Sequence, residues 1–135
     1  MSIGSLTFWS SDRIPAPVAP YSHVTTAGGW AFVTGQMPID PSTGQILRSS
    51  GVAEQTKQVM ANLCAVLDEA GYRLDQVVMV RAFLVDMEDY DVFNQAYEGW
   101  FAGQRLPSRT CVAVTGLALG ARVEIDMTAY SGDPE

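Results

Sequence analysis

The sequence predicts an α+β fold in which a single mixed β-sheet carries two helices on one face. Apolar residues recur at helical spacing in two stretches, a long one over 52–70 and a second that begins at Asp89. Segments with strand character lie before, between and after these stretches, which predicts the order β-β-β-α-β-α-β-β. The 135 residues contain no linker or repeat, so we expect one domain over 1–135, with a frayed polar tail at 131–135.

Three strands are expected before the first helix. Alternating apolar and polar residues predict a short strand at 6–10, and three prolines predict an extended loop at 14–20. Strands at 22–26 and 30–34 flank Ala27-Gly28-Gly29, a sequence typical of a tight hairpin.

Both helices have recognisable ends. The long helix is expected over 52–70, with Ser50 or Gly51 at its start and Gly71 at its end. The second helix is expected to begin at Asp89 and to end before Gly103 and Pro107. Its predicted buried stripe consists of Tyr90, Phe93, Tyr97 and Trp100.

The remaining strands are expected at 77–85, 108–115 and 122–130. The first is almost wholly apolar, which predicts a central strand covered on both faces. In the last strand every second residue is apolar and is expected to face the helices, namely Val123, Ile125, Met127 and Ala129. Glu124 and Asp126 alternate with these residues, while Arg109 and Cys111 share a face of 108–115. Isolated charges on the second sheet face are typical of a subunit interface with polar pockets.

The charge balance excludes several classes of function. The chain has 8 basic and 15 acidic residues, a net charge of −7, and only one lysine, Lys57. Because no basic cluster exists, neither nucleic acid nor an anionic membrane surface is an expected partner. A small anionic ligand is still compatible, since one buried arginine can override the net charge locally. A charged content of only 17% predicts that another subunit covers part of the surface.

The residues available for catalysis are few. His23 is the only histidine, and Cys64 and Cys111 have no metal-binding or disulfide-framework spacing, so we expect no metal and no organic cofactor. No apolar run reaches the length of a membrane span, and residues 1–11 do not resemble a signal peptide. These features predict a cytoplasmic protein.

Arg109 and Glu124 are the candidate catalytic residues. Arg109 enters an otherwise uncharged strand, where a guanidinium is suited to a planar anionic ligand. The alternative is a structural ion pair with Asp126 or Glu124. Partial burial of Glu124 between Val123 and Ile125 would raise its pKa and suit a general base. The alternative is a solvated position on an edge strand.

Four further positions are weaker candidates. Tyr21 follows the proline loop and can line a cleft or simply pack with its hydroxyl in water. Gly35, after Thr34, allows close approach of a ligand or marks a bulge. Cys111 is a small apolar residue or a contact for a ligand. His23 is expected to be an exposed strand residue.

Five motifs follow one another along the chain. They are Pro20-Tyr21-Ser22, Phe32-Val33-Thr34-Gly35-Gln36-Met37-Pro38 with Asp40-Pro41-x-Thr43-Gly44, Gln55-Thr56-x-Gln58-Val59-Met60-x-Asn62-Leu63, Pro107-x-Arg109-Thr110-Cys111-Val112, and Val123-Glu124-Ile125. In this order the motifs resemble the RidA/YjgF family of reactive-intermediate deaminases. The resemblance covers about residues 14–130 and is more specific than any single motif.

The resemblance implies a chorismate-mutase-like fold, a homotrimer with sites between subunits, and hydrolysis of 2-imino acids or enamines such as 2-aminoacrylate to 2-keto acids and ammonia. By the same resemblance, Arg109 would bind the substrate carboxylate and Glu124 would place or activate water. Cys111 would offer a backbone contact to the imine nitrogen, and the remaining pocket residues would be Tyr21, Thr34 and Gly35. The family implies no metal or cofactor.

The sequence departs from the family pattern at three places, which bear on substrate range. His23 stands where glutamine is usual, 117–121 lacks the usual Pro-Lys, and Asp126 replaces a glutamate. Two other functions fit the same residues. One is a trimer that binds a small keto acid without turnover, and the other is a pathway-specific imine deaminase on the same fold.

Overall fold

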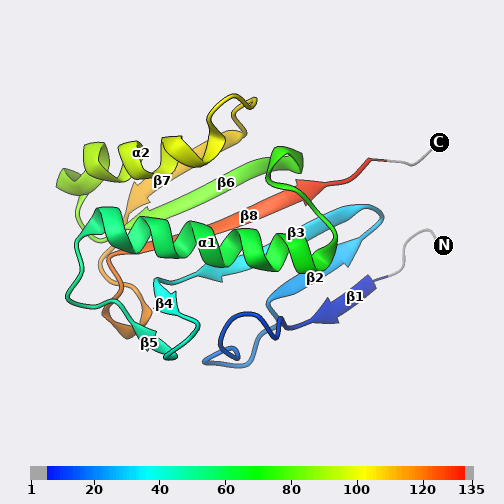
Figure 1. The fold of residues 1–135 in the computed structure, drawn as a ribbon, viewed down its shortest axis with the longest axis horizontal. Coiled ribbons are helices and arrows are strands. Elements are labelled where there is room, and N and C mark those ends of the chain that lie inside the picture. Colours follow the sequence, from blue (N-terminus) through cyan, green and yellow to red (C-terminus); the bar gives the residue numbers. More distant parts are fainter. Residues whose placement is uncertain (1–5, 133–135) are drawn as a thin grey trace.

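The computed structural model describes residues 6–132 and confirms one mixed sheet with two helices on one face (Figure 1). The main strands are β1 (Leu6–Trp9), β2 (Val24–Ala27), β3 (Trp30–Gln36), β6 (Val77–Leu84), β7 (Ser108–Ala113) and β8 (Val123–Tyr130). The helices are α1 (Val52–Ala70) and α2 (Tyr90–Glu98). A separate two-stranded ribbon, β4 (Ile39–Asp40) with β5 (Gln45–Ile46), precedes α1, and short 3-10 turns occupy Leu74–Gln76, Met87–Asp89, Gly99–Phe101 and Ala118–Gly120.

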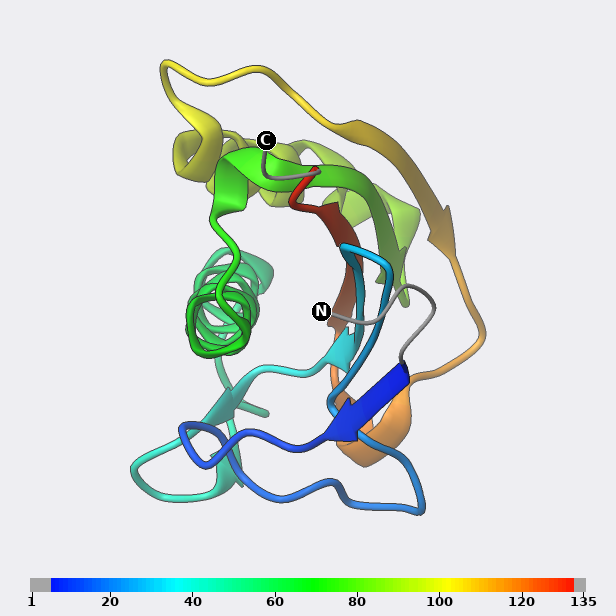
Figure 2. The same cartoon turned by 90° about the vertical axis from the view of Figure 1, so that its right-hand side faces the viewer.

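The six strands lie in the order β1-β2-β3-β8-β6-β7. Only β6 and β7 run parallel, because α2 and its loops connect them as a crossover. The C-terminal strand β8 is inserted between β3 and β6, so it is the strand that holds the two halves of the sheet together. Helix α1 packs across β8 and β3, and α2 lies beside α1 (Figures 1 and 2).

The prediction that 77–85 is a central strand covered on both faces is wrong. Strand β6 lies second from the edge, and only its helix-facing residues, such as Val80 and Ala82, are fully buried. Arg81 is exposed on the other face, and Phe83 is only half-buried. All helices of residues 6–132 lie on one side of the sheet (Figure 2), so the described chain leaves the opposite side, called here the open face, without a covering layer.

The core lies between the helices and the sheet and follows the predicted alternation in β8. Val123, Ile125, Met127 and Ala129 are buried, whereas the residues between them are half-buried on the open face. The hairpin is also confirmed: Gly28 and Gly29 have positive φ angles of 54° and 90° between β2 and β3, and L-residues with side chains rarely adopt this conformation.

The ends of the elements agree with the sequence in most places. Helix α1 runs from the N-cap Gly51 to Gly71, as predicted. A frayed tail was predicted at 131–135, but Ser131 is held in place, because its amide donates a hydrogen bond to the Gly29 carbonyl at 3.0 Å. Residues 133–135 lie outside the described part of the chain. Within 6–132, no helix is long and apolar enough to span a membrane.

Candidate active site

Glu124 lies on the open face of β8, directly against Gly35 of β3. The β3–β8 register shifts between Val33 and Gln36, so Gly35 sits at an irregularity in the pairing. A Cβ atom built on Gly35 would contact Glu124 Oε2 and would lie only 2.9 Å from its Cδ. Gly35 therefore marks a bulge, which was one of the two interpretations of this glycine. The group that approaches it closely in this structure is the Glu124 side chain, and close approach of a ligand stays a prediction.

The Glu124 carboxylate is an unpaired, half-buried acid. No hydrogen bond or ion pair to its carboxylate exists within the described residues. Burial raises the pKa of the Glu124 carboxyl above its ordinary value, and the negative charge of Asp126 raises it further. A carboxylate with a raised pKa is chemically suited to accept a proton. The alternative of a solvated position on an edge strand is wrong, because β8 is a central strand and Glu124 is half-buried.

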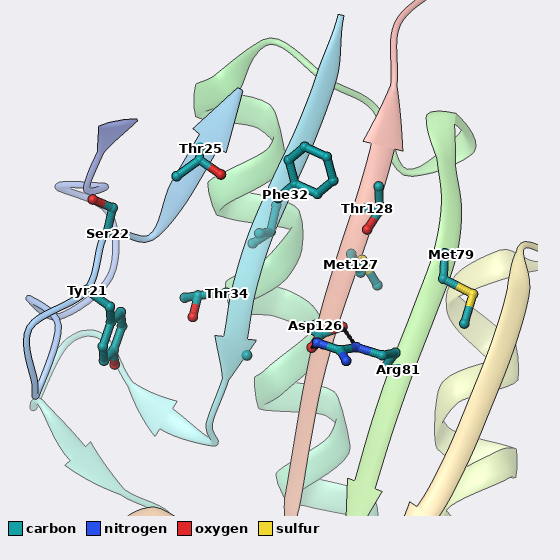
Figure 3. Close-up of a pocket in the computed structure, with 12 residues that line it drawn as sticks. Tyr21, Ser22, Thr25, Phe32, Thr34, Met79, Arg81, Asp126, Met127 and Thr128 are labelled. Atoms are coloured by element: carbon teal, nitrogen blue, oxygen red, sulfur yellow. Dashed lines mark hydrogen bonds and ion pairs between the residues drawn. The ribbon is translucent and has the colours of Figure 1, made fainter. Parts of the chain in front are cut away.

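A large cavity of about 540 Å³ lies on the open face (Figure 3). Its lining includes Gly35, which lies against Glu124, but not Glu124 itself. Tyr21, Thr34 and Gly35 line one end of it, so the structure brings together three of the predicted pocket residues. The rest of the lining includes Phe32, Met79, Arg81, Asp126 and Thr128. Polar and apolar side chains contribute about equally to the lining, so the cavity offers hydrogen-bonding groups beside apolar contacts.

Arg81 and Asp126 form the ion pair of this cavity. They face each other across β6 and β8, and the Arg81 Nε and Nη2 atoms donate to the Asp126 carboxylate at 2.8–3.1 Å (Figure 3). The suggested structural pairing of Arg109 with Asp126 or Glu124 is therefore wrong. The pairing could not be foreseen, because it depends on which residues of β6 and β8 stand opposite each other.

Arg109 lies on the other side of the sheet. In the parallel β6–β7 pairing, Arg109 stands opposite Val80 and Cys111 opposite Ala82, and both partners face the helices. The expectation that Arg109 and Cys111 lie on the second, open face is therefore wrong. The Arg109 guanidinium lies against aromatic rings of α2, and within residues 6–132 Arg109 forms no ion pair.

Cys111 packs against the core beside Arg109. Burial raises the pKa of the Cys111 thiol, while the positive charge of Arg109 acts in the opposite sense. A thiol of this kind is a weak nucleophile at neutral pH. The side chain thus behaves as the small apolar residue that the sequence suggested.

The sequence did not identify Tyr90 as a contact of Arg109. Tyr90 was expected in the buried stripe of the second helix, but 37% of it is exposed and its hydroxyl accepts a hydrogen bond from Arg109 Nη2 at 3.0 Å. Phe93 and Tyr97 are buried as predicted, and Trp100 is partly buried. The spacing of Tyr90 from Phe93 and Tyr97 was visible in the sequence, but their common contact with Arg109 was not.

His23 was predicted to be exposed, which is wrong. Only 3% of it is exposed, and its Nδ1 accepts a hydrogen bond from the Ser11 amide at 2.9 Å. It also lines a small cavity of about 20 Å³ that contains Tyr21 and Gly35. The loop from Ser11 onward folds over the end of β2 and buries the ring, a long-range contact that strand periodicity does not reveal.

The stability of the protein should depend on pH through His23. Burial lowers the pKa of His23, although the Pro15 carbonyl and the charge of Glu69 oppose the shift. A lowered pKa means that the unfolded chain binds the proton first. This contribution to stability is complete above the unfolded pKa near 6.5 and is lost as the pH falls below it.

Between about pH 7.5 and about pH 5.5, the melting temperature of the wild type should therefore fall further than that of His23→Gln. Equal falls in a calorimetric comparison would contradict this role.

Metal ligands do not gather in the described residues. No group of three or more His, Cys, Asp or Glu side chains within 6–132 is arranged to hold a metal ion.

The mixed sheet, its helical layer and the carboxylate beside the glycine bulge define a class of small α+β proteins. Residues 11–131 match the protein family described as Endoribonuclease L-PSP. The chain therefore belongs to this family, which is the RidA/YjgF family that its motifs resemble.

Relatives with assigned names cover nearly the whole chain. It is 39% identical over 120 residues to a RutC family protein of Pyrococcus horikoshii, a match that covers 89% of this chain and 94% of the relative. It is 37% identical over 123 residues to a Mus musculus protein named 2-iminobutanoate/2-iminopropanoate deaminase, with 91% and 90% covered.

Solved structures share the fold. The Rid family protein YyfA of Yersinia pestis superimposes with a TM-score of 0.89 at 32% identity, covering 93% of this chain and 99% of that one. E. coli TdcF, solved with bound serine, gives a TM-score of 0.88 at 26% identity and the same coverage. The fold expected from the sequence is thereby confirmed.

Proposed function

We propose that the protein hydrolyses 2-imino acids, and their enamine tautomers such as 2-aminoacrylate, to 2-keto acids and ammonia. The observation that carries this proposal is the unpaired, half-buried Glu124 carboxylate beside Gly35 and the large cavity. The mammalian relatives named as imine deaminases support it.

The reaction makes modest demands that these residues meet. Glu124 accepts a proton from water as the water oxygen adds to the electrophilic C=N carbon. Glu124 passes this proton to the nitrogen, which gives an amine beside the new hydroxyl group. A second proton then moves from that hydroxyl to the nitrogen as the C–N bond breaks, so that ammonia leaves and the C=O bond forms. Arg109 binds the substrate carboxylate and so fixes the distance between the imine carbon and the water. Tyr21 and Thr34 line the pocket, and the backbone at Cys111 lies beside the imine nitrogen, in roles carried over from the family.

The site requires two subunits. Arg109 and Glu124 lie on opposite faces of one sheet, with β6 between their strands, so one chain cannot apply both to one small substrate. A neighbouring subunit that places its β7 edge against the open face would supply the missing arginine. The exposed apolar residues of that face, including Phe32, are consistent with such a contact. We therefore propose a homotrimer with its sites between subunits.

Mixing two inactive variants should restore activity if the site is shared. Arg109→Lys retains Glu124, and Glu124→Gln retains Arg109, so hybrid trimers contain some interfaces with both wild-type residues. Random assembly of equal amounts should restore about a quarter of the wild-type turnover per site. Co-refolded protein that matches the sum of the separate variants would contradict a shared site, as would light scattering that reports only monomers.

Gly35→Ala should displace the Glu124 carboxylate and lower turnover by about 10²-fold. The new methyl group meets the end of a flexible side chain, so the fold should survive while the base moves out of position. The matched control is Gly99→Ala, whose Cβ meets nothing within 4 Å. Wild-type turnover in Gly35→Ala would show that the position of Glu124 is unimportant.

The direct test measures ammonia and keto-acid release from several amino-acid-derived imines generated in situ. A rate above the spontaneous one, lost in Glu124→Gln, supports the proposal, and the most rapidly hydrolysed imine separates a general from a pathway-specific deaminase. The second candidate is a ligand-binding trimer, which the serine bound to E. coli TdcF favours. It predicts keto-acid binding by calorimetry without any acceleration of hydrolysis.

A further inference from the structure

We propose that Tyr90 is a positioning residue for Arg109, holding its guanidinium fixed and unneutralised for the carboxylate of a 2-imino or 2-keto acid. The inference rests on the proposed function in assigning carboxylate binding to Arg109. It adds a residue whose hydroxyl has so far had no role.

The Arg109 guanidinium lies against three aromatic side chains and forms one hydrogen bond to them. Arg109 Nη2 donates to the Tyr90 hydroxyl at 3.0 Å. The Arg109 Cζ atom lies 5.7 Å from the centroid of the Tyr90 ring, 5.5 Å from that of Phe93 and 5.0 Å from that of Tyr97. The rings support the guanidinium by cation–π attraction, and the hydroxyl sets its orientation. The other N–H groups of the planar guanidinium stay available for two parallel bonds to a carboxylate.

The local structure explains why these groups meet. Tyr90, Phe93 and Tyr97 lie at spacings of three and four residues, so their side chains share one face of α2. The parallel pairing of β7 with β6 turns Arg109 toward that face. Since β7 is an edge strand and Arg109 is only half-buried, its free N–H groups can reach a ligand at the sheet edge.

Within residues 6–132, Arg109 has no acidic partner. Two carboxylates flank Tyr90 in the chain: Asp89 accepts a hydrogen bond from Arg122 Nη2 at 3.2 Å, and Asp91 is exposed and forms no ion pair with Arg109. Asp126 likewise forms an ion pair with Arg81. A carboxylate in the place of the Tyr90 hydroxyl would neutralise Arg109, whereas a phenol accepts the hydrogen bond and leaves the positive charge intact.

The test is Tyr90→Phe, which removes the hydroxyl and keeps the ring. Tyr90→Phe leaves Arg109 with its charge and with its N–H groups for the carboxylate, so the change should act mainly on KM and should lower kcat far less than Arg109→Lys does. We expect KM for imine hydrolysis and Kd for 2-oxobutanoate, measured by calorimetry, to rise about five- to tenfold, the size typical of the net contribution of one hydrogen bond. In an Arg109→Lys background, Tyr90→Phe should have no further effect, because the two residues act through one contact.

Tyr72→Phe is the matched control. Its hydroxyl donates to the Gly29 carbonyl at 2.9 Å, so the variant loses a hydrogen bond of similar length that does not involve Arg109. Its KM and Kd should match those of the wild type. A similar loss of affinity in both variants would mean that the effect is general destabilisation, and the proposal would be wrong.

The outcomes separate this inference from the proposed function. Wild-type KM and Kd in Tyr90→Phe, or an equal loss in the Arg109→Lys background, would overturn the role of Tyr90 and leave the deaminase proposal standing. A wild-type protein that binds 2-oxobutanoate without hydrolysing imines would defeat the deaminase proposal, and Kd alone would then decide the role of Tyr90. A wild-type protein that does neither would overturn both.

Discussion

Glu124→Gln is expected to lower imine turnover by about 10²-fold or more without destabilising the protein. Glutamine keeps the shape of the side chain and can orient water, but it cannot take a proton. The carboxylate has no partner among residues 6–132, so the substitution strands no buried cation. Affinity for 2-oxobutanoate should be unchanged or slightly higher, because a negative charge near the ligand carboxylate is removed.

The pH dependence of stability and of turnover provides a second test of the role of Glu124. The raised pKa of Glu124 means that the folded protein binds this proton more tightly than the unfolded chain. Ionisation therefore costs stability at neutral pH, and this cost vanishes below the unfolded pKa, where both states are protonated. Glu124→Gln should thus be at least as stable as the wild type at neutral pH, with the difference lost on acidification. Wild-type turnover should fall on acidification at a higher pH than an ordinary glutamate would require.

Glu54→Gln is the control for this experiment. Glu54 is an exposed carboxylate of α1 that contacts Lys57, and its loss should change neither turnover nor ligand affinity. Unchanged turnover in Glu124→Gln would remove Glu124 from the reaction. A lower melting temperature with weaker keto-acid binding would instead identify it as a structural residue.

Arg109→Lys is expected to lower kcat/KM by about 10²-fold or more, although the charge is kept. A lysine cannot form two parallel hydrogen bonds to a carboxylate, and it cannot lie flat against the rings of Tyr90, Phe93 and Tyr97. KM should rise and kcat should fall together, because the imine carbon loses its orientation toward water as well as its anchor. The melting temperature should change little, since Arg109 forms no ion pair with any of the residues 6–132.

Arg105→Lys is the matched control, a nearby exposed arginine outside the β7 strand. It should have the kinetics of the wild type. If Arg109→Lys also had wild-type kinetics, Arg109 would serve only to pack against α2, and the carboxylate site would have to be sought elsewhere.

Much of the fold could be predicted because its signals are local. The helical period over 52–70, the Gly28-Gly29 turn and the alternation of Val123, Ile125 and Met127 each depend on neighbouring residues only. The motifs around Tyr21, Gly35, Arg109 and Glu124 likewise pointed to the family before any contact was known. The exposure of His23 was predicted wrongly because its cover comes from the loop that begins at Ser11.

The placement of Arg109 and Glu124 was decided only by the tertiary structure. Side chains alternate between the faces of a sheet, so a shift of one residue in the pairing moves a side chain to the other face. The sequence by itself determined the strands, the helices and the residue types that the reaction needs. Which strands pair, and in which register, depends on contacts between distant segments, and that pairing puts the carboxylate and the guanidinium on opposite faces.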